Sequence, residues 1–96
     1  MARDRTKLTD SEVQAFVQKW PGWAVEQGML KKTYAFADFR AAMAFVNRVA
    51  DAAEAADHHP DIDIRYSKVT LALLTHDAHG LTVRDTALAA QVERFA

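Results

Sequence analysis

The 96-residue chain contains no cysteine and has only two prolines and three glycines. The lack of cysteine excludes disulfide bonds and thiol chemistry, and it suits a cytoplasmic protein. No segment rich in proline, glycine or serine marks a linker between domains. We therefore expect a single domain over residues 1–96, located in the cytoplasm.

An excess of positive charge and long apolar runs are also lacking. The net charge is -1 and no basic stripe is present, so nucleic acid is not expected as a direct partner. No apolar run reaches the length of a membrane span. Residues 1–5 lead into polar sequence without the apolar segment of a secretory signal. A domain of this size buries only about 60–65% of its unfolded surface, so we expect it to form an oligomer.

The pattern of apolar residues and helix caps predicts three helices and four strands. Helices are expected after the N-cap residues Thr9, Asp38 and Thr82, and the first and last of these have an acid three positions on, as in a capping box. The expected strands cover residues 23–26, 29–36, 62–66 and 69–79. The order α-β-β-α-β-β-α indicates an α+β fold of two layers, in which helices pack on one face of a four-stranded antiparallel sheet.

The third and fourth strands form a predicted hairpin. Their apolar residues alternate, at even positions in Ile62, Ile64 and Tyr66 and at odd positions in Val69, Leu71 and Leu73. A two-residue turn at Ser67-Lys68 explains this change and pairs Tyr66 with Val69. The same register places His59 opposite His76, with Cβ atoms about 4.5–5.5 Å apart.

Three of the four histidines, His58, His59 and His76, are therefore expected to converge where the long helix ends. Two solvated loop residues and one strand-end residue would be the ordinary alternative. Imidazole gives and takes protons near neutral pH, so the group indicates acid–base catalysis. The spacing of His76 and His79 suggests a metal site, but adjacent His58 and His59 cannot easily bind one ion and no zinc motif is present. We expect no metal.

Other residues near the histidines allow two interpretations each. Glu54 precedes His58 by one helical turn and would face roughly the same way, or it is a solvated helix charge. Asp85 is either a capping acid or a partner for an imidazole. Trp23 is of a type found more often in the core than against a ligand. Arg84 lies in the first turn of a helix, where a cation loses the benefit of the helix dipole, which hints at an anionic or carbonyl-bearing ligand.

The spacing of these residues resembles the signature of the pterin-4a-carbinolamine dehydratases. The matching pattern is Glu54, three residues, His58-His59-Pro60, five residues, Tyr66, nine residues, His76, eight residues and Asp85. It spans about a third of the chain without a gap. His79 departs from the family pattern as an extra histidine.

The resemblance implies dehydration of a 4a-hydroxytetrahydropterin to the quinonoid dihydropterin, which recycles the cofactor of aromatic amino-acid hydroxylases. The pterin is then a substrate, and no cofactor is expected. Dimers joined through the sheet, and in some members tetramers, are implied as well. The resemblance also implies His58, His59 and His76 as catalytic residues. It implies a pocket formed with Trp23, Glu54, Asp57, Leu74, Thr75, Asp77, Arg84 and Asp85.

A second function of another class stays open at this point. Animal members of this family act as dimerisation cofactors for a homeodomain transcription factor, a role exerted through protein surface. The complete histidine set favours catalysis, which a pure scaffold would not need. Either role is compatible with a hydroxylase or another protein as a partner.

Overall fold

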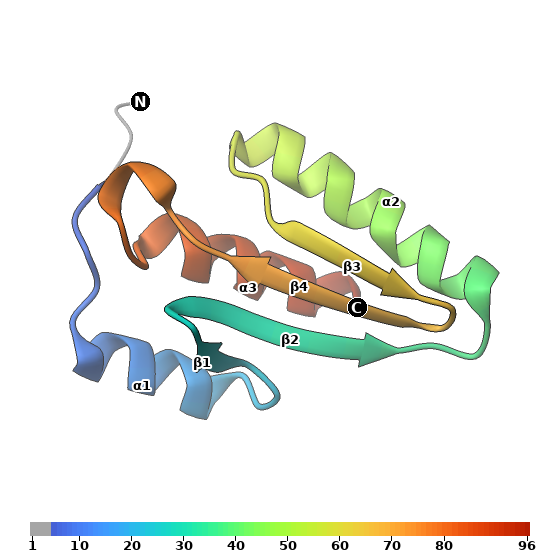
Figure 1. Ribbon diagram of the computed structural model, residues 1–96, viewed down its shortest axis with the longest axis horizontal. Helices are drawn as coiled ribbons and strands as arrows, with labels where there is room; N and C mark the ends of the chain where they lie inside the picture. The colour runs from blue at the N-terminus through green and yellow to red at the C-terminus, as the bar shows by residue number, and fades with distance from the viewer. Residues whose placement is uncertain (1–4) are drawn as a thin grey trace.

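The computed structural model describes residues 5–96 of the chain (Figure 1). The sequence predicts no secretory signal at the start of the chain, and residues 1–4, which begin that segment, lie outside the described residues. In chain order the elements are α1 (Asp10–Lys19), β1 (Ala24–Glu26), β2 (Met29–Ala35), α2 (Phe39–Ala56), β3 (Asp61–Arg65), β4 (Lys68–Leu73), the short 3-10 helix η1 (His76–Ala78) and α3 (Val83–Phe95). The predicted α+β class and element order are confirmed.

The four strands form one antiparallel sheet in the order β1-β2-β4-β3. A tight turn at Gln27-Gly28 joins β1 to β2, and both of its residues have positive φ, which glycine adopts at little cost. Strands β2 and β4, far apart in the sequence, lie side by side at the centre, with Leu30 paired to Leu73. The two edges of the sheet are therefore β1 and β3.

The turn between β3 and β4 lies one residue earlier than the sequence predicted. Arg65 pairs with Lys68, so Tyr66 and Ser67 form the turn, and Tyr66 has a φ of 53°. The predicted pairing of His59 with His76 is therefore wrong. The strand also ends early, at Leu73, and η1 follows. A shift of two residues along a strand keeps every side chain on its original face, so the apolar pattern could not detect it.

The core lies between one face of the sheet and helices α2 and α3, and α3 runs behind the sheet in Figure 1. Alanines on α2 allow close approach to its neighbours, and α1 packs partly buried apolar side chains against the same core. The fully packed members are Leu30, Val69, Leu71 and Leu73 from the sheet, Ala42, Phe45, Val49, Ala52 and Ala53 from α2, and Leu88, Ala89 and Val92 from α3. The predicted layers, with helices on one face, are confirmed.

The C-terminal end of α2 fixes where the two adjacent histidines lie. Asp57 takes the left-handed conformation, with φ of 49°, and its N–H reaches the carbonyl groups of Ala53 and Glu54. The chain then leaves the helix at His58 and enters β3 after Pro60. Beyond β4, a single bridge between Thr75 and Gly80 closes the η1 loop. These two connections, α2–β3 and β4–α3, meet at one end of the sheet.

None of the helices in residues 5–96 has the length and apolarity to cross a bilayer.

Candidate active site

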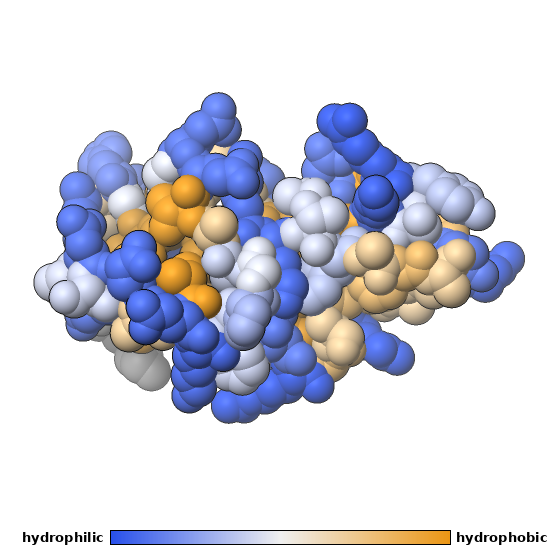
Figure 2. Space-filling view, turned by 90° about the horizontal axis from the view of Figure 1, so that it is seen from below, coloured by the Kyte–Doolittle hydropathy of each residue, from blue (hydrophilic) through white to orange (hydrophobic). Residues whose placement is uncertain are grey.

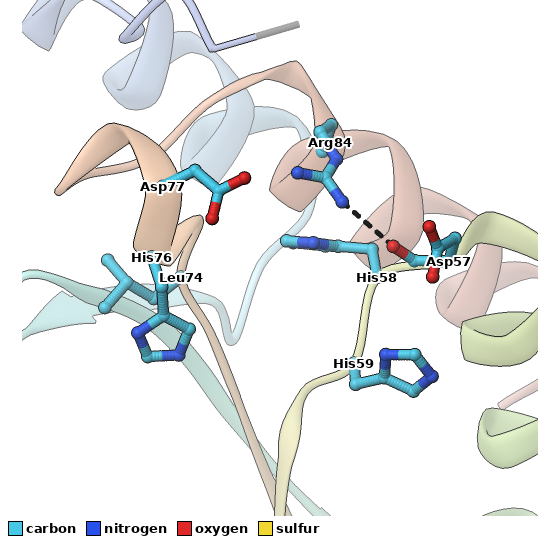
Figure 3. Close-up of a pocket in the computed structure, with 7 residues that line it drawn as sticks. All are labelled: Asp57, His58, His59, Leu74, His76, Asp77 and Arg84. Atoms are coloured by element: carbon cyan, nitrogen blue, oxygen red, sulfur yellow. Dashed lines mark hydrogen bonds between the residues drawn. The ribbon is translucent and has the colours of Figure 1, made fainter. Parts of the chain in front are cut away.

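A pocket of about 250 Å³ lies where the α2–β3 and β4–α3 connections meet (Figure 3). The first connection contributes two histidines and the second contributes one, together with acids from both and an arginine from the start of α3. The lining residues are Asp57, His58, His59, Leu74, His76, Asp77 and Arg84. The sequence therefore placed all three of the expected histidines at one site, although the register used to predict this was wrong.

A second cavity, of about 430 Å³, lies between α1, β1 and Leu81. Figure 2 views the molecule from this side and shows apolar patches among mostly polar residues. Asp10 is the one titratable side chain among the residues that line this cavity. A lone carboxyl group cannot both give and take a proton in one step. The histidine pocket is therefore the candidate active site.

His58, on the wall of the histidine pocket, forms a buried pair with Asp85. His58 Nε2 lies 2.6 Å from Asp85 Oδ1, and the two side chains are 7% and 0% exposed. The other carboxylate oxygen, Oδ2, accepts hydrogen bonds from Thr75 Oγ1 at 2.8 Å and from the backbone N–H of Thr82 at 2.9 Å. Asp85 thus lies behind His58 and does not line the pocket.

The pair with Asp85 determines which nitrogen of His58 reaches the pocket. A carboxylate accepts hydrogen bonds, so Nε2 carries the hydrogen and donates it. Among the described residues His58 has no other side-chain hydrogen bond, and no buried side-chain nitrogen or oxygen there lacks a partner. Nδ1 is therefore open to solvent, and the pocket is the space next to the ring. This arrangement leaves Nδ1 available for proton exchange.

His59 has a carboxylate partner of a different kind. Its Nε2 lies 2.5 Å from Glu54 Oε2, but the two side chains are 56% and 78% exposed. Exposed ion pairs contribute little stability, because water and salt screen the charges. Glu54 lies on α2 one turn before the histidines, as predicted, and contacts the ring without lining the pocket. This contact can orient His59 while leaving the ring accessible.

The third histidine reaches the pocket from the other connection. His76 begins η1 and lies across the pocket from His59 in Figure 3. The neighbouring Asp77 has an ion pair with Arg5, with 3.6 Å between Nη2 and Oδ2. His79 lies at the end of η1 in a left-handed conformation and does not line the pocket.

Arg84 connects the start of α3 to the end of α2. Its Nη2 donates to the backbone carbonyl of Asp57 at 2.9 Å (Figure 3). The guanidinium has five N–H donors in a planar fork. One edge of this group can therefore bind protein while another faces a ligand carbonyl, which agrees with the role that its unfavourable helix position suggested.

Besides Glu54 and Asp85, two more residues expected to form the pocket do not line it. Trp23 is buried in the core at 3% exposure, and its Nε1 donates to Glu93 Oε2 at 3.3 Å. A buried indole needs apolar neighbours and one acceptor, and the core supplies both. The side chain of Thr75 is buried too and points to Asp85. Neither residue lines the pocket, so neither has the wall position that the family resemblance implied.

One residue of this network was missed as a site component. Thr82 was predicted only as the N-cap of α3, and its capping box with Asp85 is confirmed. Its Oγ1 also lies 2.8 Å from Thr75 Oγ1. No local pattern in the sequence predicts this contact, because it depends on the Thr75–Gly80 bridge that folds the η1 loop back.

Within residues 5–96, no three His, Cys, Asp or Glu side chains are grouped so that they could hold a metal ion.

Similar proteins point to one family. The chain matches the family model described as "Pterin 4 alpha carbinolamine dehydratase" over residues 6–95. It is 51% identical over 90 residues to a protein of Thermomicrobium roseum, covering 94% of this chain and 97% of that one. It is 52% identical over 87 residues to a protein of Acidobacterium capsulatum, covering 91% and 95%. Both relatives are named provisionally as pterin-4-alpha-carbinolamine dehydratases.

Two solved structures are similar to the chain as well. A transcriptional coactivator/pterin dehydratase from Brucella melitensis superposes with a TM-score of 0.90 at 30% identity, covering 95% of this chain and 99% of that one. A pterin dehydratase-like protein described as a RuBisCO assembly factor in the alpha-carboxysome gives a TM-score of 0.65 at 27% identity, covering 77% and 86%. Proteins of this fold thus carry names from both catalysis and protein assembly.

Proposed function

Because the chain belongs to the pterin-4a-carbinolamine dehydratase family, we propose that it removes water from a 4a-hydroxytetrahydropterin and releases the quinonoid dihydropterin. The observation that carries this proposal is the pocket with three histidines, two of which have carboxylate partners. A scaffold has no need of a buried histidine–aspartate pair whose free nitrogen is open to solvent.

The proposed reaction needs two proton transfers. The bond between C4a and the hydroxyl oxygen breaks, and the hydroxyl leaves as water after an acid gives it a proton. A base takes the proton from N5, and the electron pair of that N–H bond forms the new double bond to C4a. The protein gives one proton and gains one, so it returns to its initial charge. Each well-placed transfer contributes roughly 10²–10⁴-fold to the rate.

We assign the base to His59 and the acid to His58 and His76. His58 Nδ1 would take up a proton from solvent to give the imidazolium, and would pass this proton to the leaving hydroxyl while Nε2 stays bonded to Asp85. His59, oriented by Glu54 and exposed, would accept the N5 proton. His76 lies on the opposite wall, where it would donate a hydrogen bond to the same leaving hydroxyl. Arg84 would hold a carbonyl oxygen of the pterin.

We further propose that the product re-enters the cycle of an aromatic amino-acid hydroxylase in the cytoplasm. The quinonoid dihydropterin is an oxidised form that a reductase must convert back to the tetrahydropterin. The lack of cysteine in the chain agrees with a reducing compartment. A hydroxylase that releases the hydroxylated pterin is the expected source of substrate.

A role in protein association is the second candidate, and one observation favours it. Strand β3 is an open sheet edge, and it and the turn that follows expose Ile62, Ile64 and Tyr66. Exposed apolar edge strands tend to pair with another strand. We assign this edge to a second copy of the same chain, which gives a dimer that can associate further to a tetramer. The edge is distinct from the residues that line the histidine pocket.

A turnover assay with synthetic 4a-hydroxytetrahydropterin tests the proposed function. The wild-type protein is expected to accelerate loss of the substrate well above the uncatalysed rate at neutral pH. The edge variant Ile64→Lys serves as a control, because its pocket is unchanged and it should retain turnover if catalysis does not depend on association. A folded wild-type protein without turnover would refute the dehydratase function and favour the association role.

A further inference from the structure

Thr75 and Thr82 form a buried hydroxyl pair behind the catalytic pocket. Their Oγ1 atoms are 2.8 Å apart, and the residues are 1% and 0% exposed. A buried hydroxyl costs free energy unless it is hydrogen-bonded, so a buried pair of this kind needs a complete set of partners. The partners present are the carboxylate of Asp85 and the backbone at the start of α3.

The hydrogen-bond directions in this pair follow from counting hydrogens. Thr75 Oγ1 donates its one hydrogen to Asp85 Oδ2 at 2.8 Å. It therefore acts as acceptor towards Thr82, and Thr82 Oγ1 must be the donor of that bond. Thr82 Oγ1 in turn accepts from the backbone N–H of Arg84 at 3.2 Å. A single chain of donors thus runs from α3 through both hydroxyls to the carboxylate.

This chain determines the orientation of the Asp85 carboxylate. Oδ2 receives two donors, the Thr75 hydroxyl and the Thr82 backbone N–H, so it is held in place. Oδ1 is then left to face His58 Nε2 at 2.6 Å. A carboxylate fixed in this way keeps the imidazole hydrogen on Nε2 and the reactive nitrogen, Nδ1, towards the pocket.

We propose that Thr75 and Thr82 are positioning residues that hold His58 in its reactive tautomer by acting through Asp85. The inference rests on the proposed function only where it assigns Nδ1 to proton transfer. Loss of the Thr75 hydroxyl leaves Oδ2 with one donor and allows the carboxylate to rotate. The His58 hydrogen can then move to Nδ1, and the pocket loses the lone pair that takes up the proton for the leaving hydroxyl.

Imidazole ¹⁵N NMR of protein labelled at histidine measures this tautomer directly. The spectra are recorded at a pH where the ring is neutral. The His58 Nε2 hydrogen is expected to exchange slowly, because its side chain is 7% exposed, whereas that of His59 is 56% exposed. Wild-type protein is expected to show His58 protonated at Nε2 alone. Protonation at Nδ1 in the wild type would overturn the proposal without any variant.

The variants separate the hydroxyl from the shape of the side chain. Thr75→Val keeps the shape and removes the hydroxyl. It is expected to give a mixture of tautomers and a kcat about tenfold lower, by analogy with the small end of the effect of removing an outer partner of a metal-bound histidine. KM is expected to change little. Thr75→Ser restores the hydroxyl and is expected to restore both measurements.

Thr70→Val is the matched control. Thr70 forms a similar hydroxyl pair with Thr33, at 2.7 Å, on the sheet and away from the residues that line the pocket. In the Thr70→Val variant, the ¹⁵N spectrum of His58 and the kcat should equal those of the wild type. If Thr75→Val leaves the His58 tautomer and kcat unchanged, the proposal is wrong. If the tautomer shifts while the wild type has no dehydratase activity, the positioning role stands and the proposed function fails.

Discussion

His58 Nε2 lies 2.6 Å from Asp85 Oδ1, although 27 residues separate the two along the chain. The contact joins the loop after α2 to the first turn of α3, and both partners are buried. Asp85 combines three tasks in this position. It closes the capping box of α3, accepts the Thr75 hydroxyl, and fixes the hydrogen of His58 on the nitrogen that faces away from the pocket.

We expect Asp85→Asn to lower kcat by roughly 10–100-fold, by analogy with removal of the hydrogen-bond partner of a metal-bound histidine. The amide can donate to Nε2 and so favours the wrong tautomer of His58. Steady-state kinetics and a circular dichroism spectrum would separate this effect from loss of folding. Asp51→Asn, an exposed acid on α2, is the control and should behave like the wild type. Equal kcat values for both variants would contradict the role of Asp85.

The second prediction concerns stability against pH at Glu93 on α3. Its carboxylate accepts from Lys32 Nζ at 2.7 Å, from the Tyr34 hydroxyl and from the indole of Trp23. Burial raises the pKa of Glu93, but the hydrogen bonds from Lys32 and Tyr34 and the Lys32 charge outweigh it and lower this pKa below its ordinary value of 4.5. The carboxylate therefore stabilises the fold above the unfolded pKa, and this contribution is lost as pH falls through the folded value.

We expect Glu93→Gln to lower the free energy of unfolding at pH 7 by about 1.5–3 kcal/mol, the range for hydrogen bonds to a charged group. The difference from the wild type should narrow as pH falls below 4.5, the ordinary pKa of the group. Urea unfolding at several pH values measures both effects. Glu26→Gln, on the exposed strand β1, should change stability by less than about 0.5 kcal/mol. If the difference in the free energy of unfolding between the wild type and Glu93→Gln grew as pH fell, it would contradict the predicted direction of the pKa shift.

The third prediction concerns assembly through β3. All five residues of this edge strand are exposed, and Ile64 is 38% exposed. We expect light scattering at micromolar concentration to give at least the mass of a dimer for the wild type, and a lower mass for Ile64→Lys, because a lysine on an edge strand opposes pairing. Val25→Lys, on the other edge strand β1, should leave the wild-type mass unchanged. A monomeric wild type would refute the assignment.

The fourth prediction concerns metal. General acid–base chemistry by imidazoles is sufficient for the proposed dehydration, so exhaustive chelation should leave kcat/KM unchanged. The assay compares protein before and after dialysis against a chelator, with elemental analysis of both samples. Loss of activity on chelation, restored by zinc, would overturn the proposed mechanism.

The sequence predicted the layers of the fold but placed one hairpin two residues out of register. Alternation along a strand has a period of two, so pairing Ile64 with Val69 or with Leu71 leaves the same side chains on the same face of the sheet. Only the turn distinguishes these pairings, and neither Tyr66-Ser67 nor Ser67-Lys68 contains the glycine or asparagine that would indicate its place. The histidines still line one pocket. Strand β4 ends earlier than predicted, but η1 follows it and places His76 at the pocket.

Site residues could be predicted where a local sequence pattern or the spacing typical of the family indicated them. Glu54, one turn before His58, and Asp85 at the third position of α3 both contact imidazoles, although neither lines the pocket that the resemblance implied. Trp23 could not be placed in this way, because burial in the core and contact with a ligand both favour a large aromatic residue. The direction of the Thr75 side chain depends on the bridge to Gly80, which no periodicity in the sequence predicts.

The central claim is that the three histidines of one pocket carry out acid–base dehydration of a 4a-hydroxytetrahydropterin. The most direct measurement is kcat/KM for the wild type and for His59→Ala, His76→Ala and His79→Ala under identical conditions. The first two variants should stay folded, because these side chains are exposed, and each should lower kcat/KM by at least about tenfold. Their effects should combine non-additively, since both act on one substrate. His79→Ala should match the wild type, and a crippled His79→Ala beside a fully active His59→Ala would contradict the account.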